Sequence, residues 1–110
     1  MQQLLSLKNK PDAVYAASDY AALGAMQVIN ENNYIIPNDI SLVGFGNEPF
    51  TSMTTPTITS INQHSDEIGK KAAYAFLEHS KNAIVKQTLT KRILDVDLIK
   101  RDSSNKKAFL

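Results

Sequence analysis

The chain has 110 residues, with 12 Lys and Arg against 11 Asp and Glu and a net charge of +1, so it makes at most one small domain and offers no strongly basic surface to nucleic acid or to an anionic membrane. It contains no cysteine, which excludes disulfides, thiolate catalysis and cysteine-based zinc sites and fits a cytoplasmic protein. No apolar run approaches membrane-spanning length, and residues 1–5 lack the features of a signal peptide.

The first half of the sequence predicts a strand–helix–strand unit. Residues 4–7 predict the end of a helix that stops before Pro11, because proline disfavours helix in the residue that precedes it. Residues 13–17 predict a short buried strand, and a helix follows from about residue 20 to about residue 32. The apolar stripe of this helix is Ala22, Ala25, Met26 and Ile29. Residues 41–45 predict a second strand, and the short connection implies an α/β fold with parallel pairing.

The second half predicts a helix between two further strands. Residues 57–62 predict a strand, and Ser65 is suited to cap a helix that ends near residues 80–82. The apolar stripe of that helix is Ile68, Ala72, Ala75 and Phe76. Apolar and acidic side chains alternate within residues 88–99, which is typical of a strand with one solvent-exposed face. The polar segment after Arg101 predicts a frayed tail.

Residues that carry chemistry give little support for catalysis. His64 and His79 lie far apart with no second ligand at metal spacing, so each is best interpreted as an isolated surface histidine. Asp95 and Asp97 lie on the alternating segment, where a solvated strand face is the favoured interpretation. No glycine-rich phosphate loop or nucleophile elbow is present. We therefore expect no enzyme activity, no metal site and no cofactor.

Four segments form an ordered combination, namely PDAVYAASDYAALGA at 11–25, IPNDISLVGF at 36–45, TPTITSINQ at 55–63 and LIKRDSS at 98–104. Each segment is weak alone, but their order over residues 11–104 is specific. Together they resemble the C-terminal part of the effector-binding domain of LacI/GalR-family bacterial transcriptional regulators. The resemblance implies a periplasmic-binding-protein-like domain of two α/β lobes behind a helix-turn-helix DNA-binding headpiece, which this chain lacks.

The resemblance also implies how the chain is divided. Residues 1–56 would be part of the C-terminal lobe of the effector-binding domain. Residues 57–104 would supply a crossover strand, a helix and a last strand that rejoin the N-terminal lobe, and residues 105–110 would be a frayed tail. We therefore expect a partial periplasmic-binding-protein-like fold, a fragment of a larger sensor with uncovered apolar surfaces that favour dimerisation or strand exchange.

A small-molecule effector, a sugar or related metabolite, is implied in the cleft between the lobes. Ser18 stands where family members place an effector contact, and it is equally suited to cap the helix that follows. Asp19 begins that helix, where capping is the favoured interpretation. Many family members carry an aspartate where Gly46 stands, so its absence shifts the expected contact to Asn47, and Gly46 itself suits a turn with positive φ. Gln63 would lie near the cleft, although surface decoration is its favoured interpretation.

A homodimer is implied as well. The expected interface residues are Leu23 and Met26 on the first long helix, and Phe50 and Met53 in the loop before Pro56. The helical spacing of Met26 favours the core, whereas Phe50 and Met53 are hard to bury within one chain. We expect the loop pair to carry the interface.

The sequence thus favours the effector-sensing and dimerising part of a cytoplasmic transcriptional regulator. An effector would stabilise one arrangement of the lobes, and DNA would be bound only through a headpiece outside this chain. Two alternatives stay open. One is a fragment of a periplasmic sugar-binding transport protein, and the other is a truncated dimer-forming protein that interacts with full-length regulators.

Overall fold

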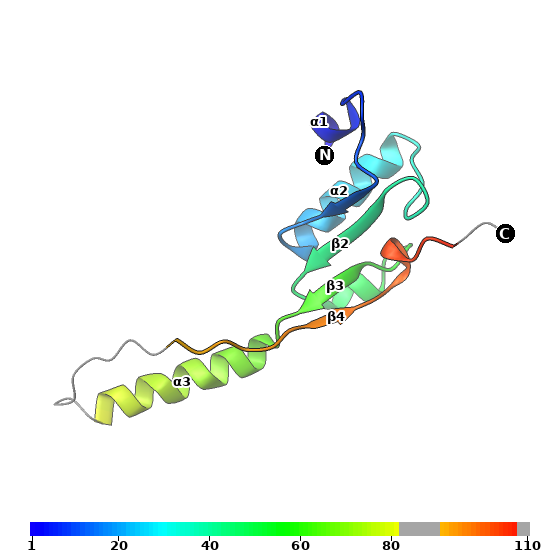
Figure 1. Cartoon of the computed structure of the whole chain (residues 1–110). Coiled ribbons are helices and arrows are strands. Elements are labelled where there is room, and N and C mark those ends of the chain that lie inside the picture. The colour runs from blue at the N-terminus through cyan, green and yellow to red at the C-terminus, as the bar shows by residue number, and fades with distance from the viewer. Residues whose placement is uncertain (82–90, 108–110) are drawn as a thin grey trace.

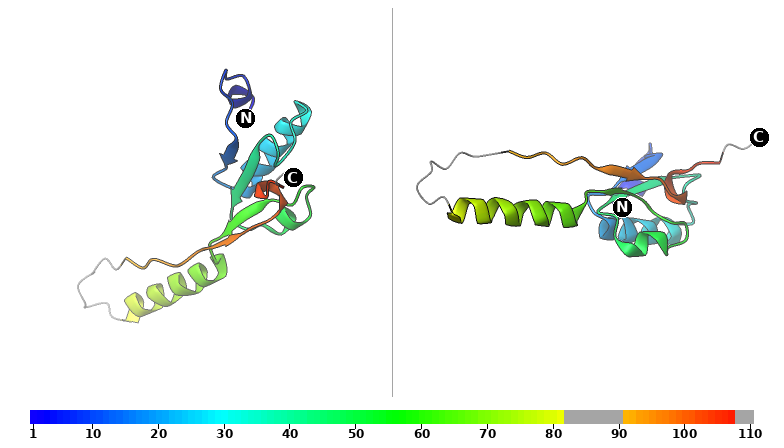
Figure 2. Two further views of the ribbon diagram at one scale, coloured as in Figure 1. Left: turned by 45° about the vertical axis from the view of Figure 1, so that its right-hand side comes forward. Right: turned by 90° about the horizontal axis from the view of Figure 1, so that it is seen from below.

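A computed structural model describes residues 1–81 and 91–107 of the chain (Figure 1). Four strands form one sheet in the order β1-β2-β3-β4, with bounds β1 Ala13–Tyr15, β2 Ser41–Phe45, β3 Thr59–Asn62 and β4 Asp97–Ile99. The α-helices are α1 Gln2–Leu5, α2 Asp19–Glu31 and α3 Ser65–Lys81, and two short 3-10 helices are η1 Pro49–Ser52 and η2 Asp102–Ser104. Helix α3 and residues 91–96 extend away from the sheet as an arm (Figures 1 and 2).

The first two strands and α2 form the predicted parallel strand–helix–strand unit. Strand β1 pairs in parallel with β2, with Ala13 opposite Ser41. The side chain of Ser18 accepts a hydrogen bond from the backbone N–H of Ala21 at 3.1 Å, as an N-cap residue does. Asp19 is the first residue of the helix itself. The capping role favoured for Asp19 from the sequence is therefore wrong, because its neighbour fills it.

The hydrophobic core lies between α2 and one face of the sheet. Ile29 of α2 and Leu42 of β2 are fully buried there. The buried apolar residues of this core are Leu5, Ala16, Ala22, Ala25, Met26, Ile29, Ile36, Ile40, Leu42 and Ile58. Full burial of a large aliphatic side chain contributes about 1.5–3 kcal/mol. This layer therefore holds α2 against β1 and β2, and it includes the whole stripe predicted for α2.

The last two strands make the sheet mixed. Strand β2 pairs in parallel with β3, but β3 pairs antiparallel with β4, with Ile61 opposite Leu98. The predicted strand over residues 88–99 is shortened to β4, since residues 91–96 form no strand and residues 88–90 lie outside the described part. Leu98 is 54% exposed, because no described element covers its side of β4. The buried face that the alternating pattern predicts is therefore not formed here.

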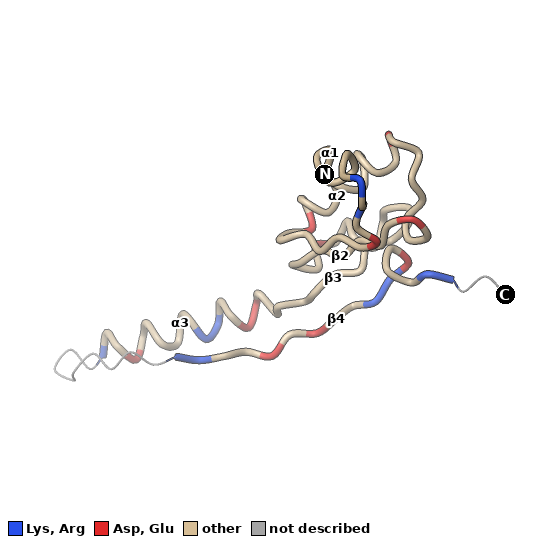
Figure 3. Tube along the Cα trace, turned by 45° about the horizontal axis from the view of Figure 1, so that its top comes forward, with Lys and Arg blue, Asp and Glu red and all other residues tan. Residues whose placement is uncertain are grey.

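Among the described residues, the sheet face opposite α2 is open at β1, residues 101–104 cover it at Thr59, and no element packs on α3. Side chains alternate along a strand, so Tyr15 and Val43 point away from α2, and Tyr15 is largely exposed. Helix α3 has the predicted bounds but buries no residue, and Phe76 of its apolar stripe is 72% exposed. Acidic and basic residues are interspersed along the arm rather than separated by sign (Figure 3). Within residues 1–81 and 91–107, no helix is long and apolar enough to cross a membrane.

The segment that follows β4 is docked on the sheet. Ser103 is fully buried, and its hydroxyl donates to the carbonyl oxygen of Leu42 and accepts from the backbone N–H of Thr59. The Thr59 hydroxyl in turn accepts from the backbone N–H of Arg101 and donates to the Arg101 carbonyl. The predicted fraying directly after Arg101 is therefore wrong, because short hydroxyl side chains here satisfy strand backbone groups instead of facing water.

A Ser103→Ala substitution is expected to lower the free energy of unfolding by about 1–3 kcal/mol, because it leaves a buried N–H and a buried carbonyl unpaired. Ser52→Ala is the matched control, since the Ser52 hydroxyl donates to the carbonyl of Pro49 at 2.9 Å but is exposed. That change should cost less than about 0.5 kcal/mol. Urea denaturation of both variants checks the pair, and equal effects would contradict the docking of η2.

Candidate functional site

The candidate site is the turn at the carboxyl end of β2, where open α/β sheets bind ligands. Gly46 has a φ of +124°, a backbone conformation that favours glycine, and Asn47 follows with a φ of 56°. The turn expected at Gly46 is thereby confirmed. It carries residues 46–48 across the sheet edge, next to the start of α2.

Asp19 is the buried centre of this edge. It is 0% exposed, its Oδ1 accepts from the Ser60 hydroxyl at 2.6 Å, and its Oδ2 accepts from the backbone N–H of Glu48 at 2.7 Å. Gly44 makes room for it, since a Cβ at Gly44 would collide with Asp19 Oδ1 and lie 3.2 Å from Asp19 Cα. Asp19 therefore ties α2 to the turn and to β3, with both carboxylate oxygens bound by protein groups.

Asn47 is held by two contacts. Its backbone N–H donates to the Ser60 hydroxyl at 3.0 Å, and its side-chain Oδ1 accepts from Arg101 Nη2 at 2.8 Å. Arg101 Nη1 also donates to the carbonyl of Ile58 at 2.9 Å. Arg101 is not among the site residues that the sequence predicted. An arginine two residues after the end of β4 was the available signal, but nothing local connects it with residue 47.

The other predicted ligand residues lie at the same sheet edge. Ser18 is half-buried after β1, and its hydroxyl hydrogen stays available because its oxygen only accepts in the helix cap. Gln63 is half-buried directly after β3. Since β1, β2 and β3 are parallel, Ser18, Asn47 and Gln63 follow the carboxyl ends of three neighbouring strands. Asp19 holds the turn that contains Gly46 and Asn47, since it accepts from the backbone N–H of Glu48.

His64 is not the isolated surface histidine that the sequence indicated. It is half-buried with a φ of 54°, and its Nε2 lies 2.7 Å from Oδ2 of Asp97. The contact joins the end of β3 to the start of β4. His79, by contrast, is exposed on α3, where its Nδ1 lies 3.0 Å from the carbonyl oxygen of Ala75. In the described ranges, no three His, Cys, Asp or Glu residues gather in a way that could hold a metal ion.

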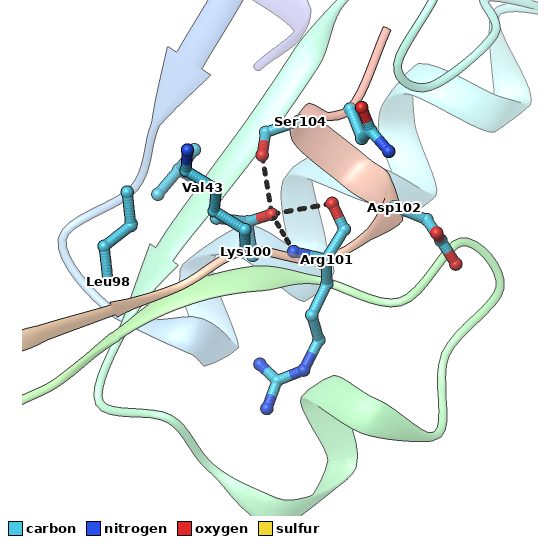
Figure 4. Close-up of a pocket in the computed structure, with 8 residues that line it drawn as sticks. Val43, Leu98, Lys100, Arg101, Asp102 and Ser104 are labelled. Carbon is cyan, nitrogen blue, oxygen red and sulfur yellow. Dashed lines mark hydrogen bonds between the residues drawn. The ribbon is translucent and has the colours of Figure 1, made fainter. Parts of the chain in front are cut away.

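A cavity of about 550 Å³ lies on the sheet face opposite α2 (Figure 4). Its lining residues are Val43, Thr59, Leu98, Lys100, Arg101, Asp102, Ser104 and Asn105. The Arg101 side chain points away from Ser104 (Figure 4). The lining includes none of the predicted ligand residues. Because Leu98 and Lys100 in this lining are exposed, we interpret the cavity as an open depression rather than the ligand site.

The four predicted interface residues differ in their exposure. Met53 is 76% exposed and Leu23 is partly exposed, so both offer surface to a partner. Phe50 is half-buried, and its ring centroid lies 4.9 Å from that of Tyr20. Met26 is only 5% exposed and belongs to the core. The interface prediction for Met26 is therefore corrected, because this residue lies on the stripe of α2 that faces the sheet.

Comparison with known proteins gives consistent matches. The sequence profile of the periplasmic binding protein-like domain matches residues 1–104. The HTH-type transcriptional repressor CytR of Escherichia coli (strain K12) is 36% identical over 104 residues, which cover 94% of this chain and 30% of the repressor. The chain thus spans about a third of the length of this relative.

Two solved structures show the same fold. The Lac repressor dimer bound to operator and the anti-inducer ONPF matches with a TM-score of 0.81 and 32% identity, over 93% of this chain and 30% of that one. A LacI family regulator from Enterococcus faecium with bound ribose matches with a TM-score of 0.79 and 26% identity, over 93% of this chain and 37% of that one. The mixed α/β sheet described above is therefore a periplasmic-binding-protein-like fold.

Proposed function

The chain belongs to the LacI family of transcriptional regulators, within their periplasmic-binding-protein-like effector domain, and we propose that it forms one wall of the cleft that binds a small-molecule effector. In this proposal, residues 1–56 belong to one lobe. Strands β3 and β4 cross between the lobes, and α3 joins the other lobe. The second wall comes from the remainder of the regulator, since the chain spans 30% of the length of the CytR relative.

The observation that carries this proposal is that uncharged polar side chains follow the carboxyl ends of three neighbouring parallel strands, with Glu48 as the ionisable side chain of the same turn. Ser18, Asn47 and Gln63 offer hydroxyl and amide groups there, whereas the carboxylate of Asp19 is already bound by Ser60 and by a backbone N–H. Hydroxyl and amide groups recognise neutral polar ligands without the cost of desolvating an unpaired charge. We therefore propose a neutral effector, a sugar or related metabolite.

The proposed mechanism is a shift between two arrangements of the lobes. An effector that binds one arrangement more tightly populates it, and operator binding changes by the same coupling free energy. The subunits pair in a homodimer through exposed apolar residues such as Leu23 and Met53. DNA is bound through a headpiece outside this chain. The names of the relatives favour this function over solute transport.

Calorimetric titration of the full regulator with ribose, glucose, cellobiose, sucrose and adenine tests the proposal. Asn47→Ala should lower the affinity for the ligand that binds most tightly at least tenfold, which corresponds to about 1.4 kcal/mol. Gly46→Asp should change the affinity as well, because it strains a φ of +124° and sets a carboxylate beside Asp19. Asn38→Ala, an exposed asparagine in the loop before β2, is the control and should have no effect. Unchanged affinity in both site variants would contradict the proposed site.

A further inference from the structure

The side chain of Arg101 has no role in the function proposed above, although it contacts Asn47 of the candidate site. We propose that Arg101 is a positioning residue that orients the amide of Asn47 toward the effector and couples the ligand-binding turn to β4. This inference rests on the proposed function and deepens it. It assigns position 47 as a hydrogen-bond donor toward the effector. It also assigns the contacts through which effector binding is coupled to β3 and β4.

The first step is the orientation of the amide. Arg101 Nη2 donates to Oδ1 of Asn47 at 2.8 Å, and a guanidinium group has no acceptor atom. The Asn47 amide must therefore turn its oxygen toward Arg101, which leaves the Nδ2 hydrogens directed elsewhere. Without the guanidinium, the two orientations of an amide are close in shape, and a ligand would meet a mixture of donor and acceptor. Arg101 thus makes position 47 a hydrogen-bond donor toward the effector.

The second step is the anchoring of Arg101 itself. Its Nη1 donates to the carbonyl of Ile58 at 2.9 Å, and its backbone N–H and carbonyl both bond to the Thr59 hydroxyl. These contacts fix both ends of a long side chain that would otherwise be mobile, and Arg101 is half-buried. A fixed guanidinium can set the geometry of its partner, whereas a mobile surface cation cannot.

The third step is the connection to the arm. The two contacts of Asn47 reach Ser60 on β3 and Arg101, two residues after the end of β4. Strands β3 and β4 are the strands from which α3 and residues 91–96 extend (Figure 1). A ligand that shifts the position of Asn47 therefore also shifts its hydrogen-bond partners, Ser60 and Arg101, and with them both strands. Coupling of this kind needs contiguous contacts with defined partners, and each link is a hydrogen bond of 3.0 Å or less.

A double-mutant cycle in the full regulator tests the inference, with the ligand that binds most tightly among ribose, glucose, cellobiose, sucrose and adenine. Arg101→Ala should weaken binding about tenfold when Asn47 is present and less than about twofold in the Asn47→Ala background. Lys100→Ala removes a neighbouring exposed cation and should leave the affinity unchanged. Equal losses from Arg101→Ala in both backgrounds would overturn the positioning role.

A measurement without ligand separates this inference from the proposed function. Arg101→Ala should speed amide hydrogen exchange at Asn47 at least tenfold, while exchange at Leu42 in the core strand stays unchanged. If none of the five compounds binds the wild-type regulator, the proposed neutral effector is contradicted and exchange at Asn47 decides the role of Arg101. Unchanged exchange at Asn47, or equal acceleration at Leu42, would overturn the role of Arg101.

Discussion

A Gly44→Ala substitution is expected to destabilise the fold by about 2–3 kcal/mol, although it adds a single methyl group. The added Cβ would collide with Oδ1 of Asp19, and it would lie 3.2 Å from Asp19 Cα and 3.3 Å from the Cβ of Ala22. Both neighbours are 0% exposed, so neither has free space to move into. Relief would require α2 to shift away from β2, which would open the core and displace the Asp19 carboxylate. The change in the free energy of unfolding is measured by urea denaturation.

Gly24→Ala is the matched control for this effect. A Cβ at Gly24 meets no atom within 4 Å, and the residue lies inside α2. Alanine is a better helix former than glycine, so this change should stabilise the protein by about 0.5–1 kcal/mol. The two glycine substitutions thus have opposite predicted signs. A neutral or stabilising Gly44→Ala would mean that α2 does not approach β2 as closely as described.

An Asp19→Ala substitution is expected to lower the free energy of unfolding by about 2–5 kcal/mol, because it leaves two buried hydrogen-bond donors without an acceptor. The Ser60 hydroxyl and the backbone N–H of Glu48 both bond to this carboxylate, at 2.6 and 2.7 Å. The loss should also free the turn at 46–48, so ligand affinity should fall together with stability. Thermal unfolding reports the first effect, and calorimetric titration of the same variant reports the second.

Asp39→Ala is the control for Asp19→Ala, since its Oδ2 also accepts a backbone N–H at 2.7 Å, from Ile35, but at an exposed position. Water replaces the lost carboxylate there, so the free energy of unfolding should fall by only about 1 kcal/mol. The comparison therefore separates the effect of burial on stability from the effect of the hydrogen bond itself. Similar losses in the two variants would show that Asp19 does not organise the site.

The fold was predictable where its signals are local. Ser18 before an apolar stripe predicts the start of α2, and the bounds of β2 and α3 follow from short apolar or amphipathic runs. Exposure was not predictable in the same way, because the stripe of α3 is present but no described element packs on it. Ser103 gave no local signal at all, since its burial depends on contacts with strands 44 and 61 residues earlier in the chain.

The candidate site was predictable only in part. Gly46 was identified by its residue type, because glycine tolerates the positive φ that the turn requires. Asp19 was placed at the right sheet edge but with the wrong structural role, since either of two neighbouring polar residues could have capped α2. Arg101 was missed because its contact with Asn47 spans 54 positions of the sequence, and no single segment carries that information.

Mapping the bound ligand on the regulator by NMR tests most directly whether the turn at 46–48 lines the effector site. The ligand that binds most tightly among ribose, glucose, cellobiose, sucrose and adenine is titrated into isotope-labelled protein, and backbone amide shifts are followed. The largest shifts within this chain are expected at Ser18, Asn47 and Gln63. Shifts confined to the cavity opposite α2, at Lys100, Ser104 and Asn105, would contradict this expectation.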